Sequence, residues 1–100
     1  MSRLEIAIDG NRCQLQGVLN FASVADSDAI LSRIAAMGDS LSVNFAGIER
    51  VDSAATAFML ELCRRIELAG GTVSFTGIPP HLMSLLTLFH LEKVLPLTGE

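Results

Sequence analysis

Hydrophobic and polar residues alternate along four short stretches of the chain, and this alternation is typical of half-buried β-strands. The four stretches are residues 4–9, 12–16, 41–45 and 72–76. The turn sequence Asp9-Gly10-Asn11 separates the first two stretches, so we expect them to pair as a β-hairpin. Strands covered on both sides would be continuously apolar, so we expect helices on only one face of the sheet.

Three further segments carry apolar residues at the spacing of an α-helix. The first helix is predicted to begin near Ser23, whose spacing to Asp26 makes a capping box, and to reach about Met37. Gly38 then supplies the stop signal. The residues expected to point inward from this helix are Ile30, Leu31 and Ile34.

The other two helices have clear signals at their ends. The second is predicted to begin at Asp52 or Ser53 and to end at about Ala69, because Gly70-Gly71 is typical of the residues that follow a helix. The third follows Pro79-Pro80, since proline suits the first helical turn. Its apolar stripe is expected to contain Leu82, Leu85, Leu86 and Phe89.

These elements follow one another in the order ββαβαβα, and a short extended tail near residues 94–97 can add one more strand. We therefore predict a two-layer α/β fold, in which a four-stranded mixed sheet carries its helices on one face. The one-sided pattern of the strands disfavours a three-layer Rossmann fold. Residues 1–100 are expected to form a single domain, because this length leaves no room for a second core.

The composition narrows the classes of function. The formal net charge is -4 and the seven lysines and arginines are scattered, so a nucleic acid is not an expected ligand. No stretch reaches the roughly 18–20 apolar residues of a spanning helix, so no direct membrane insertion is expected. Glu5 and Asp9 interrupt the place of a signal peptide, which predicts a cytoplasmic location. Cys13 and Cys63 are expected as free thiols, with a disulfide as the alternative.

The sequence offers no combination of residues that typically forms an active site. Its two histidines, His81 and His90, lack the spacing and the added carboxylate of a zinc site, so they are expected on the surface or at the end of the third helix. The sequence also contains no phosphate-binding glycine loop and no nucleophile elbow. We therefore expect no catalytic residue, no metal, no cofactor and a function that is not enzymatic.

The segment from Val43 to Ser53 is the most informative one for function. It is predicted to leave the third strand, to cross the top of the sheet as a loop and to enter the second helix at Asp52-Ser53. Either side chain of this pair can cap the helix by accepting a hydrogen bond from a free amide. Alternatively, Ser53 is a switch, because a phosphate there is tolerated by the helix dipole and adds about -1.5 to -2 charges. A third interpretation, nucleotide binding at this loop, rests only on the helix N-terminus.

The second predicted helix is apolar on two faces. Its buried stripe is expected to contain Ala55, Phe58, Met59, Leu62, Cys63, Ile66 and Ala69. The opposite face carries a strip that leads away from Ser53 and consists of Ala57, Leu60, Arg64 and Leu68. Single exposed leucines are normal, but a continuous apolar strip with one arginine is typical of a protein–protein contact.

The predicted element order and the run from Val43 to Ser53 resemble the STAS domain family. The similarity extends over nearly the whole chain and includes the segments 17–21 and 70–77. The pair Asp52-Ser53 stands at the Asp-Ser or Asp-Thr signature of the family. The family usually continues with a small residue and a glycine, whereas this chain continues with Ala54-Ala55. Alanine suits a helix better than glycine, so this difference concerns the docking of a partner and not the fold.

The resemblance implies a module that binds another protein. The segments 19–24, 49–54 and 77–82 are most similar to MlaB-type subunits of phospholipid ABC transporters, in which the hydroxyl matching Ser53 and the helix after it lie against the ATPase subunit. Such a protein is cytoplasmic and is held at the inner membrane only through its partner. The alternative is an anti-sigma factor antagonist, in which the residue matching Ser53 is phosphorylated by a partner kinase that is also the anti-sigma factor.

Overall fold

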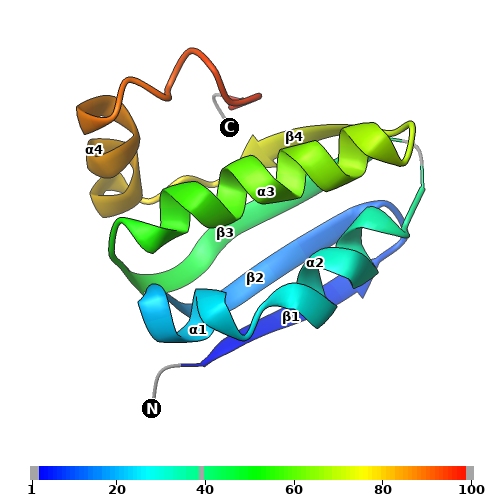
Figure 1. Cartoon of the computed structure of the whole chain (residues 1–100), viewed down its shortest axis with the longest axis horizontal. Coiled ribbons are helices and arrows are strands. Elements are labelled where there is room, and N and C mark those ends of the chain that lie inside the picture. The colour runs from blue at the N-terminus through cyan, green and yellow to red at the C-terminus, as the bar shows by residue number, and fades with distance from the viewer. Residues whose placement is uncertain (1–2, 39, 99–100) are drawn as a thin grey trace.

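The computed structural model describes residues 3–38 and 40–98 of the chain (Figure 1). The elements, in chain order, are β1 (Leu4–Asp9), β2 (Arg12–Leu19), α1 (Phe21–Ala25), α2 (Asp28–Ala35), β3 (Ser40–Val51), α3 (Ala54–Leu68), β4 (Thr72–Thr76) and α4 (Pro80–Leu88). This order confirms the predicted one with a single change, because two helices stand in place of the first predicted helix.

The four strands form one mixed sheet, as predicted, and within it they lie in the order β1-β2-β3-β4. β1 and β2 pair antiparallel through a two-residue turn, in which Gly10 adopts a φ of 63°. The pairs β2–β3 and β3–β4 are parallel. The tail adds the expected short extra pairing, because the amide of Phe75 donates to Pro96 O (2.8 Å) and the amide of Thr98 donates to Phe75 O (2.9 Å).

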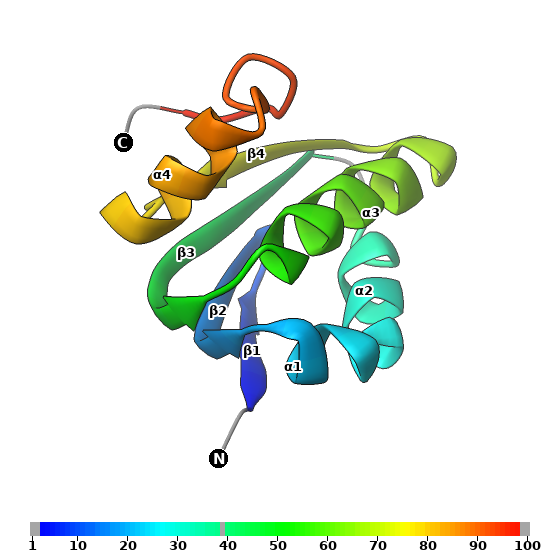
Figure 2. The same cartoon turned by 60° about the vertical axis from the view of Figure 1, so that its left-hand side comes forward.

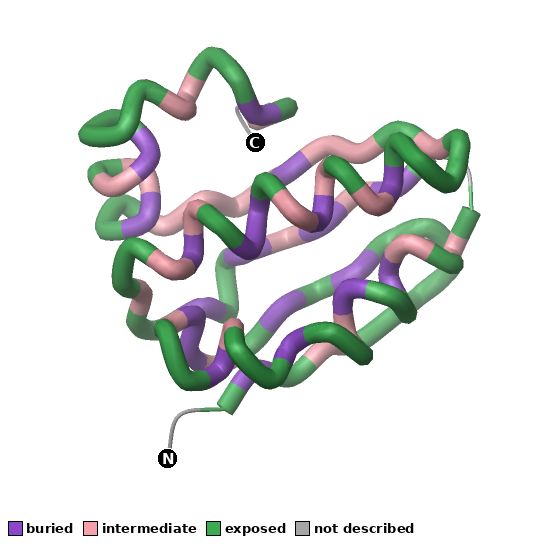
Figure 3. Tube along the Cα trace, in the orientation of Figure 1, coloured by how far each residue is buried: buried purple, intermediate pink, exposed green. Residues whose placement is uncertain are grey.

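Helices α1, α2 and α3 cover one face of the sheet, and the other face stays open (Figures 1 and 2). α4 contacts α3 and β3, and its Leu82 and Leu86 join the same hydrophobic core as the strands. The buried residues of strands and helices lie between the two layers (Figure 3), where the rings of Phe45 and Phe75 pack edge to face with centroids 5.3 Å apart. This confirms the predicted two-layer arrangement.

The prediction of the first helix is wrong in two respects: the helix begins earlier than Ser23, and two helices stand in place of one. α1 begins after the N-cap residue Asn20, whose side chain accepts a hydrogen bond from the amide of Ser23 (3.0 Å). Ser23 is therefore the third residue of the helix and closes the capping box from the other side, instead of opening a box with Asp26. The hydroxyl of Ser27 then donates to Val24 O (2.7 Å), a local bond that competes with helix continuation, and α2 begins afterwards.

The third strand is longer than predicted. β3 continues to Val51, so the expected loop over the top of the sheet is strand that pairs with the second half of β2. Two irregularities in this pairing shift the register, and they interrupt the alternation by which the strand would be recognised in the sequence. Gly47 lies at one of them, where a Cβ would stand 2.7 Å from the carbonyl oxygen of Leu15.

The apolar stripe of α4 is shorter than predicted. Leu82 and Leu86 are fully buried and Leu85 is half-buried, but Phe89 is 46% exposed. The reason is that the helix ends at Leu88 and the chain turns at His90, which has a φ of 59°. Phe89 thus leaves the helical periodicity that would have turned it inward.

Candidate functional site

Two helices begin at the same end of the sheet, because the carboxyl ends of β2 and β3 lie side by side. Leu19 and Val51 are partners in the parallel pairing, and the amide of Asp52 donates to Leu19 O (3.1 Å). α1 follows β2, and α3 follows β3, so the first turns of both helices meet above the carboxyl ends of the central strands (Figure 2). Open α/β sheets commonly bind ligands and partners at the carboxyl ends of their strands.

The carboxylate of Asp52 joins the two helix starts. Its Oδ2 accepts a hydrogen bond from the amide of Phe21 (3.0 Å), and its Oδ1 accepts one from the amide of Ala54 (2.8 Å). Both amides belong to first turns and lack partners within their own helices. Asp52 is therefore the residue of the predicted pair that caps, and it caps two helices at once.

The neighbouring hydroxyl is left free by this arrangement. Ser53 occupies the N-cap position of α3 with helical backbone angles, and its side chain makes no capping hydrogen bond. Its carbonyl oxygen accepts from the hydroxyl of Thr56 (2.7 Å). Among the described residues, no side chain or backbone group hydrogen-bonds the Ser53 hydroxyl, which lies on an exposed residue. The hydroxyl is thus available to a partner or to a modifying enzyme.

An apolar groove of about 440 Å³ lies between α1 and the start of α3. It is lined by Phe21, Val24, Ala25, Asp52, Ser53, Ala54 and Ala57. Phe21 is the most conspicuous of these residues, because 77% of its surface is exposed although it is a large aromatic residue. Phe21 was not among the predicted site residues, and its signal in the sequence is a large apolar residue directly after the N-cap Asn20.

The outer strip of α3 (Ala57, Leu60, Arg64 and Leu68) is exposed, as predicted. Leu60 is 41% exposed and Leu68 is 74% exposed. On the opposite side of the helix, Ala55, Phe58, Met59, Leu62 and Ile66 are buried, whereas two residues expected with them are not: Cys63 is half-buried and Ala69 is exposed. Because Ala57 also lines the groove, the groove and the outer strip form one surface, here called the docking surface.

An ion-pair network fixes the arginine of this surface. The Glu61 carboxylate accepts two hydrogen bonds from Arg64 (2.8 and 2.6 Å) and one from Arg65 (2.8 Å). Arg65 continues to α2, where it reaches Asp28 Oδ1 at 2.6 Å. The hydrogen bonds from Arg64, and then those from Arg65, lower the pKa of Glu61 to about 2. Arg64 therefore presents an oriented guanidinium whose charge is largely balanced.

The other residues singled out in the sequence, two histidines and two cysteines, do not line the groove and do not belong to the outer strip. His81 is exposed in the first turn of α4 and His90 is exposed after its end, as expected. Cys13 and Cys63 are free thiols, also as expected, and burial raises the pKa of each to about 11. Within residues 3–38 and 40–98, no three His, Cys, Asp or Glu side chains are grouped to hold a metal ion. No helix in these ranges is long and apolar enough to span a membrane.

Comparison with known proteins gives one family and one fold. The family model described as "Mlab, STAS domain" matches residues 3–97. No curated protein sequence matches the chain.

Several solved structures share the fold at low sequence identity. A putative anti-sigma factor antagonist from Thermotoga maritima has a TM-score of 0.75 at 14% identity, over 97% of this chain and 86% of that one. RsbS from Moorella thermoacetica has a TM-score of 0.68 at 22% identity, over 97% and 86%. The Bacillus cell fate determinant SpoIIAA in its phosphorylated form has a TM-score of 0.65 at 16% identity, over 97% and 92%.

Proposed function

Because the chain belongs to the STAS domain family through its MlaB-type family model, we propose that it is a non-enzymatic, cytoplasmic accessory subunit that binds the ATPase of a phospholipid ABC transporter. The contact is assigned to the docking surface, with Ser53 at its centre. Phe21 and the groove lie on one side of Ser53, and the outer strip of α3 extends on the other. No chemistry is required of the protein, because binding shifts the ATPase toward one assembled state.

The observation that carries this proposal is a groove lined mostly by apolar side chains, with exposed large hydrophobic residues on it and beside it. Phe21, Leu60 and Leu68 are all exposed large hydrophobic residues, and the groove between α1 and α3 is lined mostly by apolar side chains. A concave apolar centre with aromatic and arginine anchors is typical of the energetic core of a protein interface. We therefore expect Phe21 to insert into the partner and Ala57 to form the floor of the contact.

Asp52 has a positioning role in this proposal. Its two hydrogen bonds, to the amides of Phe21 and Ala54, set the distance between α1 and α3 and so keep the groove open. Arg64 is held by Glu61, which reduces the entropy that a long side chain loses on binding. The surface is thus preorganised before the partner arrives.

Affinity purification from the native cytosol and from solubilised membranes tests the proposal, with Leu60→Asp as the disrupting variant. A buried carboxylate at the contact should weaken binding by tenfold or more, roughly 1.4 kcal/mol. Leu88→Asp is the matched control, because Leu88 is 68% exposed on α4 and lies outside the docking surface. Recovery of an ABC ATPase by the wild type and by Leu88→Asp, but not by Leu60→Asp, is the expected result. Equal recovery by all three would remove the outer strip from the interface.

The free Ser53 hydroxyl favours a second candidate, an anti-sigma factor antagonist switched by phosphorylation at Ser53. The hydroxyl is exposed and stands at the start of a 15-residue helix, where a phosphate is stabilised by the helix dipole. Under this alternative, Ser53→Asp should weaken binding to a kinase partner while Ser53→Ala preserves it. If Ser53 is only a docking contact, the two variants should bind with similar affinity.

A further inference from the structure

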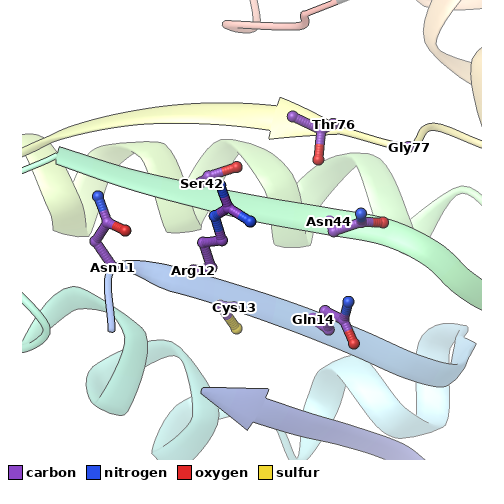
Figure 4. A pocket seen from close by; sticks show the side chains of 8 residues that line it. All are labelled: Asn11, Arg12, Cys13, Gln14, Ser42, Asn44, Thr76 and Gly77. Atoms are coloured by element: carbon purple, nitrogen blue, oxygen red, sulfur yellow. The ribbon is translucent and has the colours of Figure 1, made fainter. Parts of the chain in front are cut away.

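A second hollow, of about 610 Å³, lies on the open face of the sheet, opposite to the face that packs on α1, α2 and α3. It is lined by Asn11, Arg12, Cys13, Gln14, Ser42, Asn44, Thr76 and Gly77 (Figure 4). Its volume lies in the range of small-molecule sites, and the hollow is open to solvent on one side. The proposed protein contact does not use this face, so the hollow needs an explanation of its own.

The lining is built by the strand register. Gln14 of β2 pairs with Asn44 of β3, which pairs with Thr76 of β4, so three polar side chains form one row across three strands. One step along the strands, Arg12 pairs with Ser42 and starts a second row. Figure 4 shows the Arg12 side chain extending from β2 toward β3 at Ser42. Side chains on one face of neighbouring strands can contact the same ligand.

The hollow offers more donors than acceptors. The Oδ1 atom of Asn44 already accepts a hydrogen bond from the amide of Ala46 (2.7 Å), which leaves the two N–H groups of its amide as donors. Gly77 makes room for this arrangement, because a Cβ there would stand 2.4 Å from the same Oδ1. Arg12 is the only charged residue of the lining, and none of the ion pairs among the described residues includes it.

We propose that this hollow binds a small phosphorylated polyol, such as a sugar phosphate. The phosphate lies at Arg12 and Ser42, since a guanidinium binds phosphate oxygens by charge-assisted hydrogen bonds. The hydroxyl groups of the ligand lie along the row of Gln14, Asn44 and Thr76. None of the eight lining residues is aromatic, so a nucleobase would have no ring on which to stack, and a nucleotide is disfavoured.

Titration of the full chain with glucose 6-phosphate, followed by backbone amide NMR, tests the proposal, with glucose and inorganic phosphate as separate arms. Glucose 6-phosphate should shift the amides of β2, β3 and β4 saturably in the millimolar range or below. Arg12→Gln should weaken its binding by tenfold or more. Asn44→Asp keeps the acceptor for Ala46 but replaces the donors with a carboxylate, so it should abolish binding. Arg33→Gln, an exposed arginine of α2, is the matched control and should leave binding unchanged.

Each of the other outcomes overturns the proposal. The absence of saturable shifts with glucose 6-phosphate in the wild type would show that the hollow does not bind such a ligand. Equal affinity of the wild type and Arg12→Gln would show that Arg12 does not bind the phosphate. Glucose binding as tightly as its phosphate shows that no phosphate is recognised, and inorganic phosphate binding as tightly as glucose 6-phosphate shows that the polyol is not. The same spectra report whether each variant is folded, and Asn44→Asp provides an independent test if Arg12→Gln is not.

Discussion

Replacing Asp52 tests how this small domain positions its docking surface. Asp52→Ala removes both hydrogen bonds of the carboxylate, to the amide of Phe21 in α1 and to that of Ala54 in α3. A hydrogen bond to a charged group contributes about 1.5–3 kcal/mol where it is shielded from water, and a helix cap contributes about 0.5–2 kcal/mol. Because Asp52 is exposed, we take the typical value of a helix cap, about 1 kcal/mol, for each of the two bonds and expect a loss of about 2 kcal/mol in the free energy of unfolding.

Urea unfolding followed by circular dichroism measures this loss. For a domain of this size, about 2 kcal/mol corresponds to a fall in Tm of roughly 8–16 °C. Asp52→Asn should lose less, since its one carbonyl oxygen can still accept from Ala54 while its NH₂ group faces the amide of Phe21. Glu49→Ala is the control, because Glu49 is an exposed acidic residue of β3 whose side chain makes no hydrogen bond or ion pair among the described residues. If Asp52→Ala unfolds at the same urea concentration as the control, the double capping contributes no stability and the argument fails.

Three other predictions follow from single features of the structure. His90→Gly should raise the free energy of unfolding by about 1 kcal/mol, because glycine adopts the left-handed φ of 59° without the strain that a side chain causes. Urea unfolding measures this change, and a loss of stability would contradict the prediction. The contribution of Glu61 to stability should be complete above its ordinary pKa of 4.5 and should be lost as the pH falls toward its folded pKa of about 2. Glu61→Gln should remove this part of the pH dependence of the free energy of unfolding. If the pH profile of the variant equals that of the wild type, the ion-pair network does not contribute to stability. Both thiols, with pKa values of about 11, should react slowly with iodoacetamide at neutral pH compared with glutathione; rapid alkylation of the folded protein would contradict their burial.

The parts of the fold that could be predicted are those with short-range signals. The hairpin turn at Gly10 and the end of α3 at Gly70 both depend on glycine in a left-handed conformation, which the sequence announces directly. The exposed face of α3 was also predictable, because helical spacing alone separates Leu60 and Leu68 from the buried stripe.

The parts that could not be predicted depend on contacts between distant residues. The second half of β3 is held by pairing with β2 across register shifts, so its own sequence lacks the strand alternation. The choice between Asp52 and Ser53 as the cap depends on Phe21, which is 31 residues away along the chain and reaches Asp52 only because β2 and β3 end together. The groove beside Ser53 is therefore visible only in the folded protein.

Hydrogen exchange of the chain alone and in complex with the captured ATPase tests the central claim most directly, because it reports which surface the partner covers. The account predicts slower exchange of amides in α1 and along α3 when the partner is bound, with the amides of β2, β3 and β4 unchanged. Protection confined to α4 or to these strands, with α1 and α3 unaffected, would contradict the assignment of the docking surface.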